Sequence, residues 1–411
     1  LALGRGACAH YAPAPPHPAQ FVADLDARRL PEKPAGVAWT GADLLSAALT
    51  RNPQIVEARA KRLAALAAAR AAKSPPGPSL TLTAEYANEA PHWGYSGAGD
   101  IPLDYGARRS VRITTANLQA LQAFYDYGEA IWNVRTALEK ARGDSIAANA
   151  ELKLADESVA VRRERASRIE RRVAAGQDAR AVAIVARTDL IAAQRRRGAA
   201  IGRQGAAAAD LAKALGVAPE AVRGMNLGTM GAPEIIMLTE IATWRRDAAL
   251  SRGDVLRAVA DYDIAENALR LEIANQYPAI SLGPGYNYDH GVTKLPFSLS
   301  LALPPWDLNR RAIAQAEAVR TAAGRSLELA QANALAAVDS THAAFLTAWN
   351  DESRTFSQDL PTVMDAERRA KASADAGEAD RVDELAARGA TLDVRLNLVD
   401  AQHAELSART D

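Results

Sequence analysis

The chain has 411 residues, and its 49 basic and 49 acidic side chains give a formal net charge of zero. That balance, with no basic stripe interleaved with aromatic residues, gives no reason to expect nucleic acid as a partner. Aromatic residues make up only 5% of the chain and alanine is abundant, which favours helices packed closely in thin layers over a thick globular core. The single cysteine excludes an internal disulfide, and no apolar run reaches the roughly 18 residues of a transmembrane helix.

Residues 1–39 are expected to form an extended N-terminal arm, because the prolines between Pro13 and Pro34 disfavour regular helix. The apolar start of the chain is similar to the end of a signal segment. Ala7 before Cys8 suits a bacterial lipoprotein processing site, although Arg5 stands where leucine is usual. Cys8 is therefore a candidate for lipid attachment, and the alternative is an inert thiol on a disordered arm.

Residues 40–216 predict a helix, a β-hairpin, a long helix and a return helix. A helix over 40–73 breaks near Asn52-Pro53, and apolar residues alternate with polar ones over the strand 79–86. A short second strand ends near Leu103. From Arg108 to Ala175, apolar or small residues recur at alternating steps of four and three, which is the seam of a coiled coil about 100 Å long.

Residues 243–411 repeat this order after a connector at 217–242. The motif Ala48-Leu-Thr-Arg51 returns as Ala249-Leu-Ser-Arg252, and Ala175-Gly176 returns as Ala376-Gly377. Both pairs have an offset of 201 residues, so the chain is a tandem duplication. The second repeat predicts a helix over 243–276, strands over 280–289 and 295–303, a long helix over 309–375 and a return helix over 381–408.

The two predicted hairpins give four strands with one apolar face. Four strands cannot close on themselves, and an open sheet leaves its edges unpaired. Three copies would supply twelve strands, within the range of outer-membrane barrels, together with six helix pairs that can close a tube. The expected fold is therefore mainly α with a small β part, and trimerisation is the simplest closure.

From about Asp43 to Ala408 the chain resembles the TolC-type outer-membrane efflux proteins. The resemblance rests on the duplicated order of elements, on the two Ala-Gly tips, on Ala48-Leu-Thr-Arg-Asn-Pro53 and on Leu303-Pro-Pro-Trp-Asp-Leu-Asn-Arg-Arg311. It implies a homotrimer with a 12-stranded β-barrel in the lipid of the bacterial outer membrane and an α-helical tunnel across the periplasm. It also implies passive efflux, with a periplasmic adaptor (membrane fusion) protein and an inner-membrane pump of the RND type as partners.

A narrower resemblance concerns the substrate. Asp104-Tyr-Gly-Ala-Arg-Arg-Ser-Val-Arg112 is similar to the acidic-x-Gly-Gly-Lys-Arg-x-x-Arg stretch of the CzcC-like branch, with Ala107 and Arg108 in place of glycine and lysine. That branch implies heavy-metal efflux and heavy-metal resistance. The alternatives are a channel for drugs or other organic solutes, and a soluble coiled-coil scaffold in which the hairpins serve as dimerisation tabs.

In the resembled family, aspartates shortly after the second tip glycine narrow the periplasmic entrance. Asp383 lies six residues after Gly377 at one such position, with Asp380 and Glu384 beside it, whereas the further family aspartate is Ala386 here. An acidic ring at a constriction attracts cations. The alternative is that these acids solvate a helix N-terminus and favour its dipole.

The tip glycines Gly176 and Gly377 are expected to end their helices and, by the family resemblance, to contact the adaptor. No His-x₃-His or Cys/His cluster has the spacing of metal ligands, so no metal site is expected. No phosphate-binding glycine-rich loop and no nucleophile elbow occur, so the sequence predicts no enzyme and no cofactor.

Overall fold

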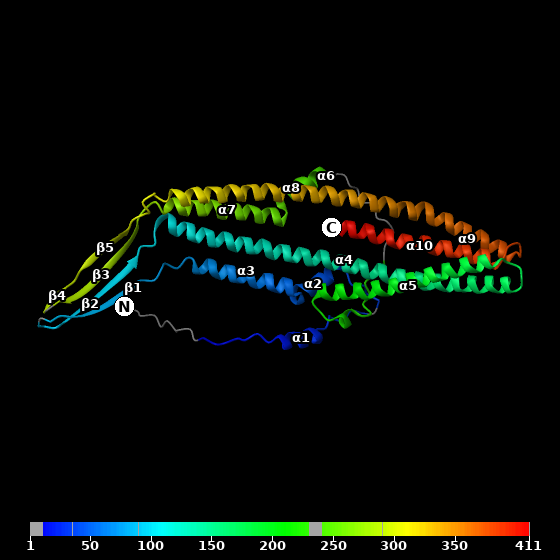
Figure 1. Cartoon of the computed structure of the whole chain (residues 1–411), viewed down its shortest axis with the longest axis horizontal. Helices are drawn as coiled ribbons and strands as arrows, with labels where there is room; N and C mark the ends of the chain where they lie inside the picture. The colour runs from blue at the N-terminus through cyan, green and yellow to red at the C-terminus, as the bar shows by residue number, and fades with distance from the viewer. Residues whose placement is uncertain (1–10, 35, 89, 230–240, 290, 411) are drawn as a thin grey trace. The chain divides into compact units, whose positions relative to one another are not determined.

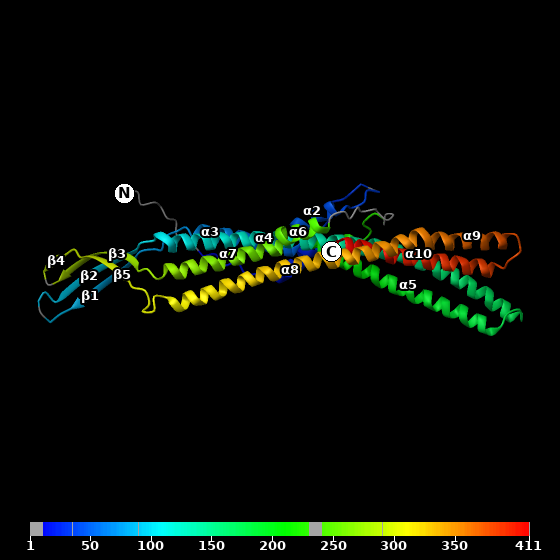
Figure 2. The same cartoon turned by 90° about the horizontal axis from the view of Figure 1, so that it is seen from above.

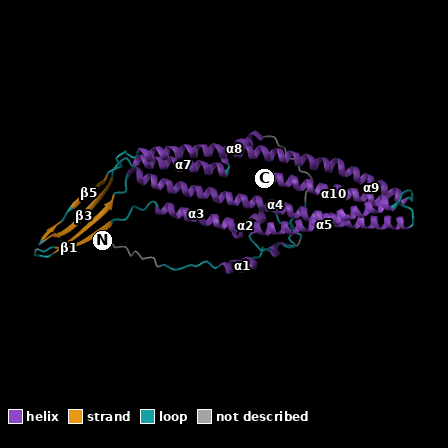
Figure 3. Cartoon of the chain, in the orientation of Figure 1, coloured by secondary structure: helices purple, strands orange, loops and turns teal. Residues whose placement is uncertain are grey.

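The computed structural model is mainly helical with one small antiparallel sheet (Figure 3). It describes residues 11–34, 36–88, 90–229, 241–289 and 291–410. Cys8, the predicted lipid attachment site, lies outside these residues. Two compact units form, and each takes segments from both predicted repeats. The sheet unit contains residues 54–134 and 233–351, and the tip unit contains residues 1–53, 135–232 and 352–410.

The sheet belongs to the sheet unit and joins the two hairpins through their inner strands (Figure 1). In the first hairpin, β1 (Ser79–Tyr86) pairs with β2 (Trp93–Pro102) so that Ser79 faces Asp100. Strand β2 pairs in turn with β3 (Ala279–Asp289). Strand β3 pairs with both β4 (Val292–Lys294) and β5 (Phe297–Ala302). The predicted apolar face is exposed within this chain, as at Leu82 and Leu299, which are 76% and 59% exposed.

Two strand predictions need correction. The strand expected over 295–303 is shorter and forms β5 alone, whereas β4 precedes it in residues that were not predicted as strand. Pro296 lies between β4 and β5 because it has no N–H for the ladder; its carbonyl accepts the Gly285 N–H at 2.8 Å. The second strand of the first hairpin is longer than predicted and starts at Trp93. Its glycines suggested a loop, but they let neighbours approach: a Cβ at Gly97 would lie 3.3 Å from the Leu82 side chain.

The helices of the sheet unit are α3 (Pro53–Ala71), α6 (Ile241–Ser251), α7 (Gly253–Ala274) and the first parts of α4 (Gly106–Ala174) and α8 (Arg310–Arg354). Small side chains pack α3 against α4 at Ala69, Ala116 and Ala120. The helix predicted over 243–276 is in fact α6 and α7, because Arg252 is extended before the poor helix former Gly253.

In the tip unit, α4 continues as one helix of 69 residues, and α5 (Arg180–Leu215) returns beside it. Helix α9 (Leu360–Asp375) and α10 (Arg381–Thr410) form the second hairpin and run side by side (Figure 2). Both return helices pack on α4. Ala166 and Ile169 of α4 contact Ala186 of α5, and Val161 of α4 contacts Leu385 of α10. Within the described parts of the chain, no helix combines the length and hydropathy that a membrane crossing requires.

The long helix predicted over 309–375 is interrupted by a π-turn at Thr355–Asp359, labelled η2, which separates α8 from α9. Pro361 follows within two residues of this turn. Proline has no N–H to donate, and its ring requires room where the preceding turn would lie. A wider turn directly before the proline supplies that room.

A short helix, α1 (Pro18–Ala27), forms inside the predicted extended arm. The prediction failed because Pro18 occupies the first turn, where its missing N–H costs no hydrogen bond. The next residue after α1, Arg28, donates to the carbonyl of Arg51 at 3.0 Å and to that of Gly216 at 2.9 Å. Arg28 therefore ties the arm to the C-terminal ends of α2 (Gly41–Arg51) and α5. After α5, the described part of the connector holds the short 3₁₀ turn η1 (Pro219–Val222).

Candidate functional site

The two helix tips reverse the chain through glycines in the left-handed region, Gly176 with φ of 74° and Gly377 with φ of 76°. A side chain at such a φ is strained, so glycine suits both positions. The amide that follows each glycine donates back to the last turn of the helix, from Gln177 to the Arg172 carbonyl at 2.8 Å and from Glu378 to the Ser373 carbonyl at 2.9 Å. This 6→1 bond is the Schellman pattern, so both tips end in the same way.

Asp380, directly before α10, links the two tips. One of its oxygens accepts the Val382 N–H at 3.0 Å, and the other forms an ion pair with Arg172 of α4. Arg172 also donates to Asp178 of the first tip at 3.0 Å. The Val382 N–H, and then the Arg172 charge, lower the pKa of Asp380 below its ordinary value. Asp380 therefore caps α10 and holds the two hairpins together.

The two other acids of the predicted gate differ sharply in environment. Glu384 is only 6% exposed and forms an ion pair with Arg381 one turn earlier in the same helix. Asp383 is exposed in the first turn of α10, and its carboxylate has no hydrogen-bond or ion-pair partner among the described residues. Only Asp383 of the three therefore offers a free carboxylate within the described parts of the chain. The sequence could not reveal this division, because Arg172 lies more than 200 residues away from Asp380.

The Asp104–Arg112 stretch, which carries the resemblance to the metal branch, has a structural role in the sheet unit. The side chain of Asp104 is 8% exposed, and its two oxygens accept hydrogen bonds from the two Nη atoms of Arg112, at 3.0 and 2.7 Å. Arg112 Nε also donates to the Ala72 carbonyl at 3.0 Å, at the end of α3. The hydrogen bond from Arg112 lowers the pKa of Asp104. This pair therefore fastens the end of β2 and the start of α4 to the end of α3.

Arg108, in the first turn of α4, holds the end of α7 in the same way. Its guanidinium donates to the Asn275 side chain at 3.2 Å and to the Tyr277 carbonyl at 2.6 Å, directly after α7. The two arginines thus hold the C-terminal ends of both short helices, where carbonyl groups lack partners within the helix. Arg108 and Arg112 of this stretch therefore have structural roles.

We expect Arg112→Ala to lower the thermal midpoint of the purified protein, because it leaves the buried Asp104 carboxylate without its bidentate partner. The midpoint is followed by circular dichroism at 222 nm. Arg109→Ala is the matched control, since Arg109 Nε is 3.7 Å from Asp104 and its side chain is 47% exposed. Equal midpoints for the two variants would contradict this role for Arg112.

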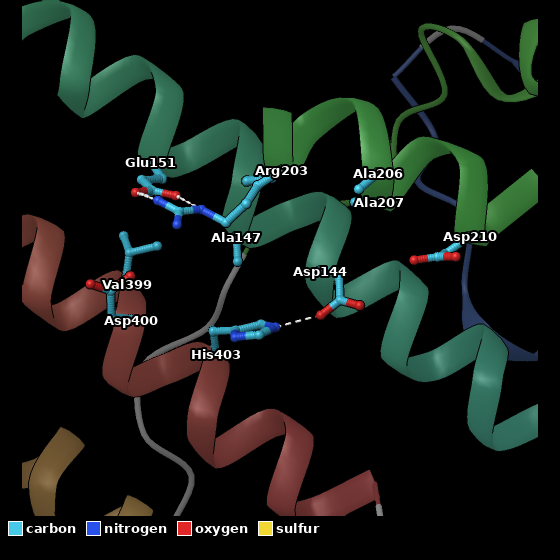
Figure 4. Close-up of a pocket in the computed structure, with 11 residues that line it drawn as sticks. Asp144, Ala147, Glu151, Arg203, Ala206, Ala207, Asp210, Val399, Asp400 and His403 are labelled. Atoms are coloured by element: carbon cyan, nitrogen blue, oxygen red, sulfur yellow. Dashed lines mark hydrogen bonds and ion pairs between the residues drawn. The ribbon is translucent and has the colours of Figure 1, made fainter. Parts of the chain in front are cut away.

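A pocket of about 370 Å³ lies among α4, α5 and α10 in the tip unit (Figure 4). His403 pairs with Asp144, while Arg203 Nε donates to Glu151 at 2.8 Å. Asp400, at the rim, accepts from Arg196 at 2.8 Å. These pairs join the three helices. In the described parts of the chain, no group of three or more His, Cys, Asp and Glu side chains is arranged to hold a metal ion.

Comparisons with known proteins agree with this fold. The family model described as outer membrane efflux protein matches residues 44–217, which is less than half of the chain. A membrane protein from Pseudomonas aeruginosa has a TM-score of 0.75 and 19% identity, over 92% of this chain and 97% of that chain. The outer membrane protein VceC from Vibrio cholerae has a TM-score of 0.72 and 17% identity, over 90% and 94%. The structure of CusC has a TM-score of 0.71 and 16% identity, over 92% of this chain and 93% of that chain. No curated protein sequence matches the chain.

Residues 44–217, within the predicted first repeat, match the family model, and the fold of nearly the whole chain is that of outer-membrane channels. Proteins of this family are passive channels and not enzymes; they are homotrimers that work with adaptor proteins and inner-membrane pumps. Their helical part lies largely in the periplasm. Residues 44–217 therefore match the outer membrane efflux protein family, and the chain has the fold of TolC-type outer-membrane channels.

Proposed function

We propose that three copies of this chain form an efflux channel for cations, with Asp383 as the acidic group at the periplasmic entrance. The observation that carries the proposal is the exposed carboxylate of Asp383 in the first turn of α10, which has no partner among the described residues. In a trimer, three such carboxylates at the narrow end of the tube would attract cations and repel anions. Asp380 and Glu384 contribute less, because each is already paired with an arginine.

Gating in this proposal is a separation of the two tips. The link between Arg172 and Asp380 joins the end of α4 to the start of α10, so it resists movement of the α9–α10 hairpin away from α4. The pKa of Asp380 is lowered, so this link contributes above the ordinary value of 3.8 and is lost as the pH falls through the lower value in the folded protein. The link is therefore fully present at neutral pH.

Heavy-metal cations are the proposed substrate class, and drugs or other organic solutes are the alternative. Support comes from the CzcC-like stretch and from the sign of the Asp383 charge. The stretch gives only weak support for a metal substrate, because Arg108 and Arg112 have structural roles at helix ends. Conductance with Zn²⁺, Cu²⁺ and a large organic cation as charge carriers separates the two classes. Equal permeation of all three would argue against metal selectivity.

We expect Asp383→Asn to reduce the preference of the channel for cations over anions. The amide keeps the size of the side chain and removes its charge. The measurement is the reversal potential of the purified trimer in a planar bilayer under a salt gradient. Asp375→Asn, which alters an exposed aspartate at the end of α9, is the control. An unchanged reversal potential in Asp383→Asn would remove Asp383 from the entrance.

Three parts of the proposal concern partners. We propose that the tips at Gly176 and Gly377 contact the periplasmic adaptor, that the pump is of the RND type, and that Cys8 carries lipid in the outer membrane. Cross-linking from cysteines placed beside the tip glycines tests the first, and co-purification with the pump tests the second. The intact mass of the purified protein tests the third, because the mass of the unmodified chain would exclude acylation.

A further inference from the structure

Two buried carboxylic acids lie in the tip unit, one on α8 and one on α10. Glu352, near the end of α8, is 2% exposed, and Glu405 of α10 is 9% exposed. One carboxylate oxygen of Glu352, Oε2, is buried and has no hydrogen-bond partner among the described residues. A buried carboxylate that keeps its charge without a partner is costly, so this position favours the neutral acid.

Two side chains of α10 act on the Glu352 carboxyl. From α10, Glu405 adds a negative charge and Gln402 donates a hydrogen bond. Along its own chain segment, Arg354 lies 3.9 Å from Asp359 of the π-turn, and Asp351 has a partner of its own. Arg409, one turn beyond Glu405, is also engaged. Burial, and then the charge of Glu405, raise the pKa of Glu352, while Gln402 acts in the opposite direction.

The pair lies beside an irregular point of the fold. The π-turn η2 begins at Thr355, three residues after Glu352, and Thr355 is 6% exposed. This turn packs on both α9 and α10. A π-turn in a long helix has weaker hydrogen bonding than the α-helix around it, so small changes in neighbouring packing act there first.

We propose that Glu352 and Glu405 form a buried proton site, which holds α10 against the π-turn while a proton is bound and releases it when the proton is lost. While Glu405 is ionised, a neutral Glu352 avoids a second negative charge in the same buried region. When that proton leaves, two negative charges remain in a buried place and repel each other. The α9–α10 hairpin then loosens at its base as the pH rises. This inference holds whichever solute the channel conducts.

The direction of the pH dependence follows from proton linkage. A carboxyl whose pKa is raised by folding binds its proton more tightly in the folded protein. Its contribution to the free energy of unfolding is complete below the ordinary value of 4.5 and declines as the pH rises through the higher value in the folded state. Stability should therefore fall from acid toward alkaline pH, opposite to the effect of the Asp380 pair.

The test compares wild type with Glu352→Gln as full-length protein in detergent. This substitution keeps the size of the side chain and removes the group that ionises. We expect the thermal midpoint of wild type to decline as the pH rises above 4.5, and that of Glu352→Gln to change less and to exceed wild type at the alkaline end. Glu378→Gln, which alters an exposed acid at the second tip, is the control and should follow wild type.

A second measurement reports the proton directly. In infrared spectra recorded as the pH is raised, wild type should keep the C=O stretch of a protonated carboxyl to a higher pH than an ordinary glutamic acid does, and Glu352→Gln should lack this carboxyl band. Glu405→Gln covers the case in which Glu352→Gln does not fold. It removes the repelling charge, so its thermal midpoint should exceed that of wild type at alkaline pH. A wild type without the carboxyl band, or pH profiles that are parallel for wild type and both variants, would overturn the proposal.

Discussion

Replacing Arg172 by alanine should raise the time that the purified trimer spends conducting in a planar bilayer, several-fold at neutral pH. Arg172 forms ion pairs with Asp380 of the second hairpin and Asp178 of the first, so its loss releases both tips at once. The link is present in every copy of the chain, and a trimer loses three. A single exposed ion pair contributes little, which is why the expected effect depends on all three acting together.

Arg171→Ala is the matched control for this experiment. Arg171 is the neighbouring residue of α4, is exposed, and carries the same charge. It shares the electrostatic surroundings of Arg172 without its contacts to the tips. Asp380→Asn should open the channel in the same direction as Arg172→Ala, and the double variant should add little to either single one. Equal conduction by the Arg171 and Arg172 variants would show that general charge, and not the link, controls the tips.

The second large effect concerns stability. Leu385 is 1% exposed and packs with Leu392 of α10 and with Val161 and Leu154 of α4. Leu385→Ala should lower the free energy of unfolding by about 2–5 kcal/mol, because it removes buried methyl groups and leaves a cavity where α10 meets α4. Guanidinium unfolding in detergent, followed by circular dichroism, measures the change.

Leu385→Met serves as the control because it nearly conserves the volume of the side chain and should cost less than about 1.5 kcal/mol. Since Leu385 follows Asp383 by two residues, the alanine variant should also make the second tip more sensitive to protease. If the alanine and methionine variants unfold at the same denaturant concentration, the contact between α10 and α4 does not depend on this side chain.

Much of the fold was predictable because local patterns agree with the tertiary structure. The alternation over 79–86 corresponds to β1, and the seam from Arg108 to Ala175 corresponds to α4 within two residues at its start. Thr40 caps α2 through a reciprocal capping box with Asp43, a pattern that lies within four residues of the sequence. In each case the signal lies within a few neighbouring residues.

The errors arose where one residue has two possible meanings. Proline usually breaks a helix, yet Pro18 begins α1. The opposite error was made at Pro361, where an unbroken helix was predicted and the structure has a π-turn directly before the proline. Glycine reads as a loop residue, yet Gly97 lies within β2. The position of a proline or glycine within an element decides its effect, and the sequence alone does not give that position.

The candidate site could be predicted only in part for a different reason. Spacing after Gly377 selected Asp380, Asp383 and Glu384, because position along a helix is local information. Which of them is paired depends on Arg172 from the other repeat and on burial of the α10 face. The buried acids Glu352 and Glu405 gave no signal either, because both read as ordinary surface residues of polar helix faces.

The most direct test of the proposed channel is the ion conductance of the detergent-purified trimer in a planar bilayer, measured with a salt gradient. The proposal predicts discrete current steps that favour cations, longer openings in Arg172→Ala, and a weaker cation preference in Asp383→Asn. An inserted trimer that conducts in neither wild type nor Arg172→Ala, or that favours anions, would contradict it.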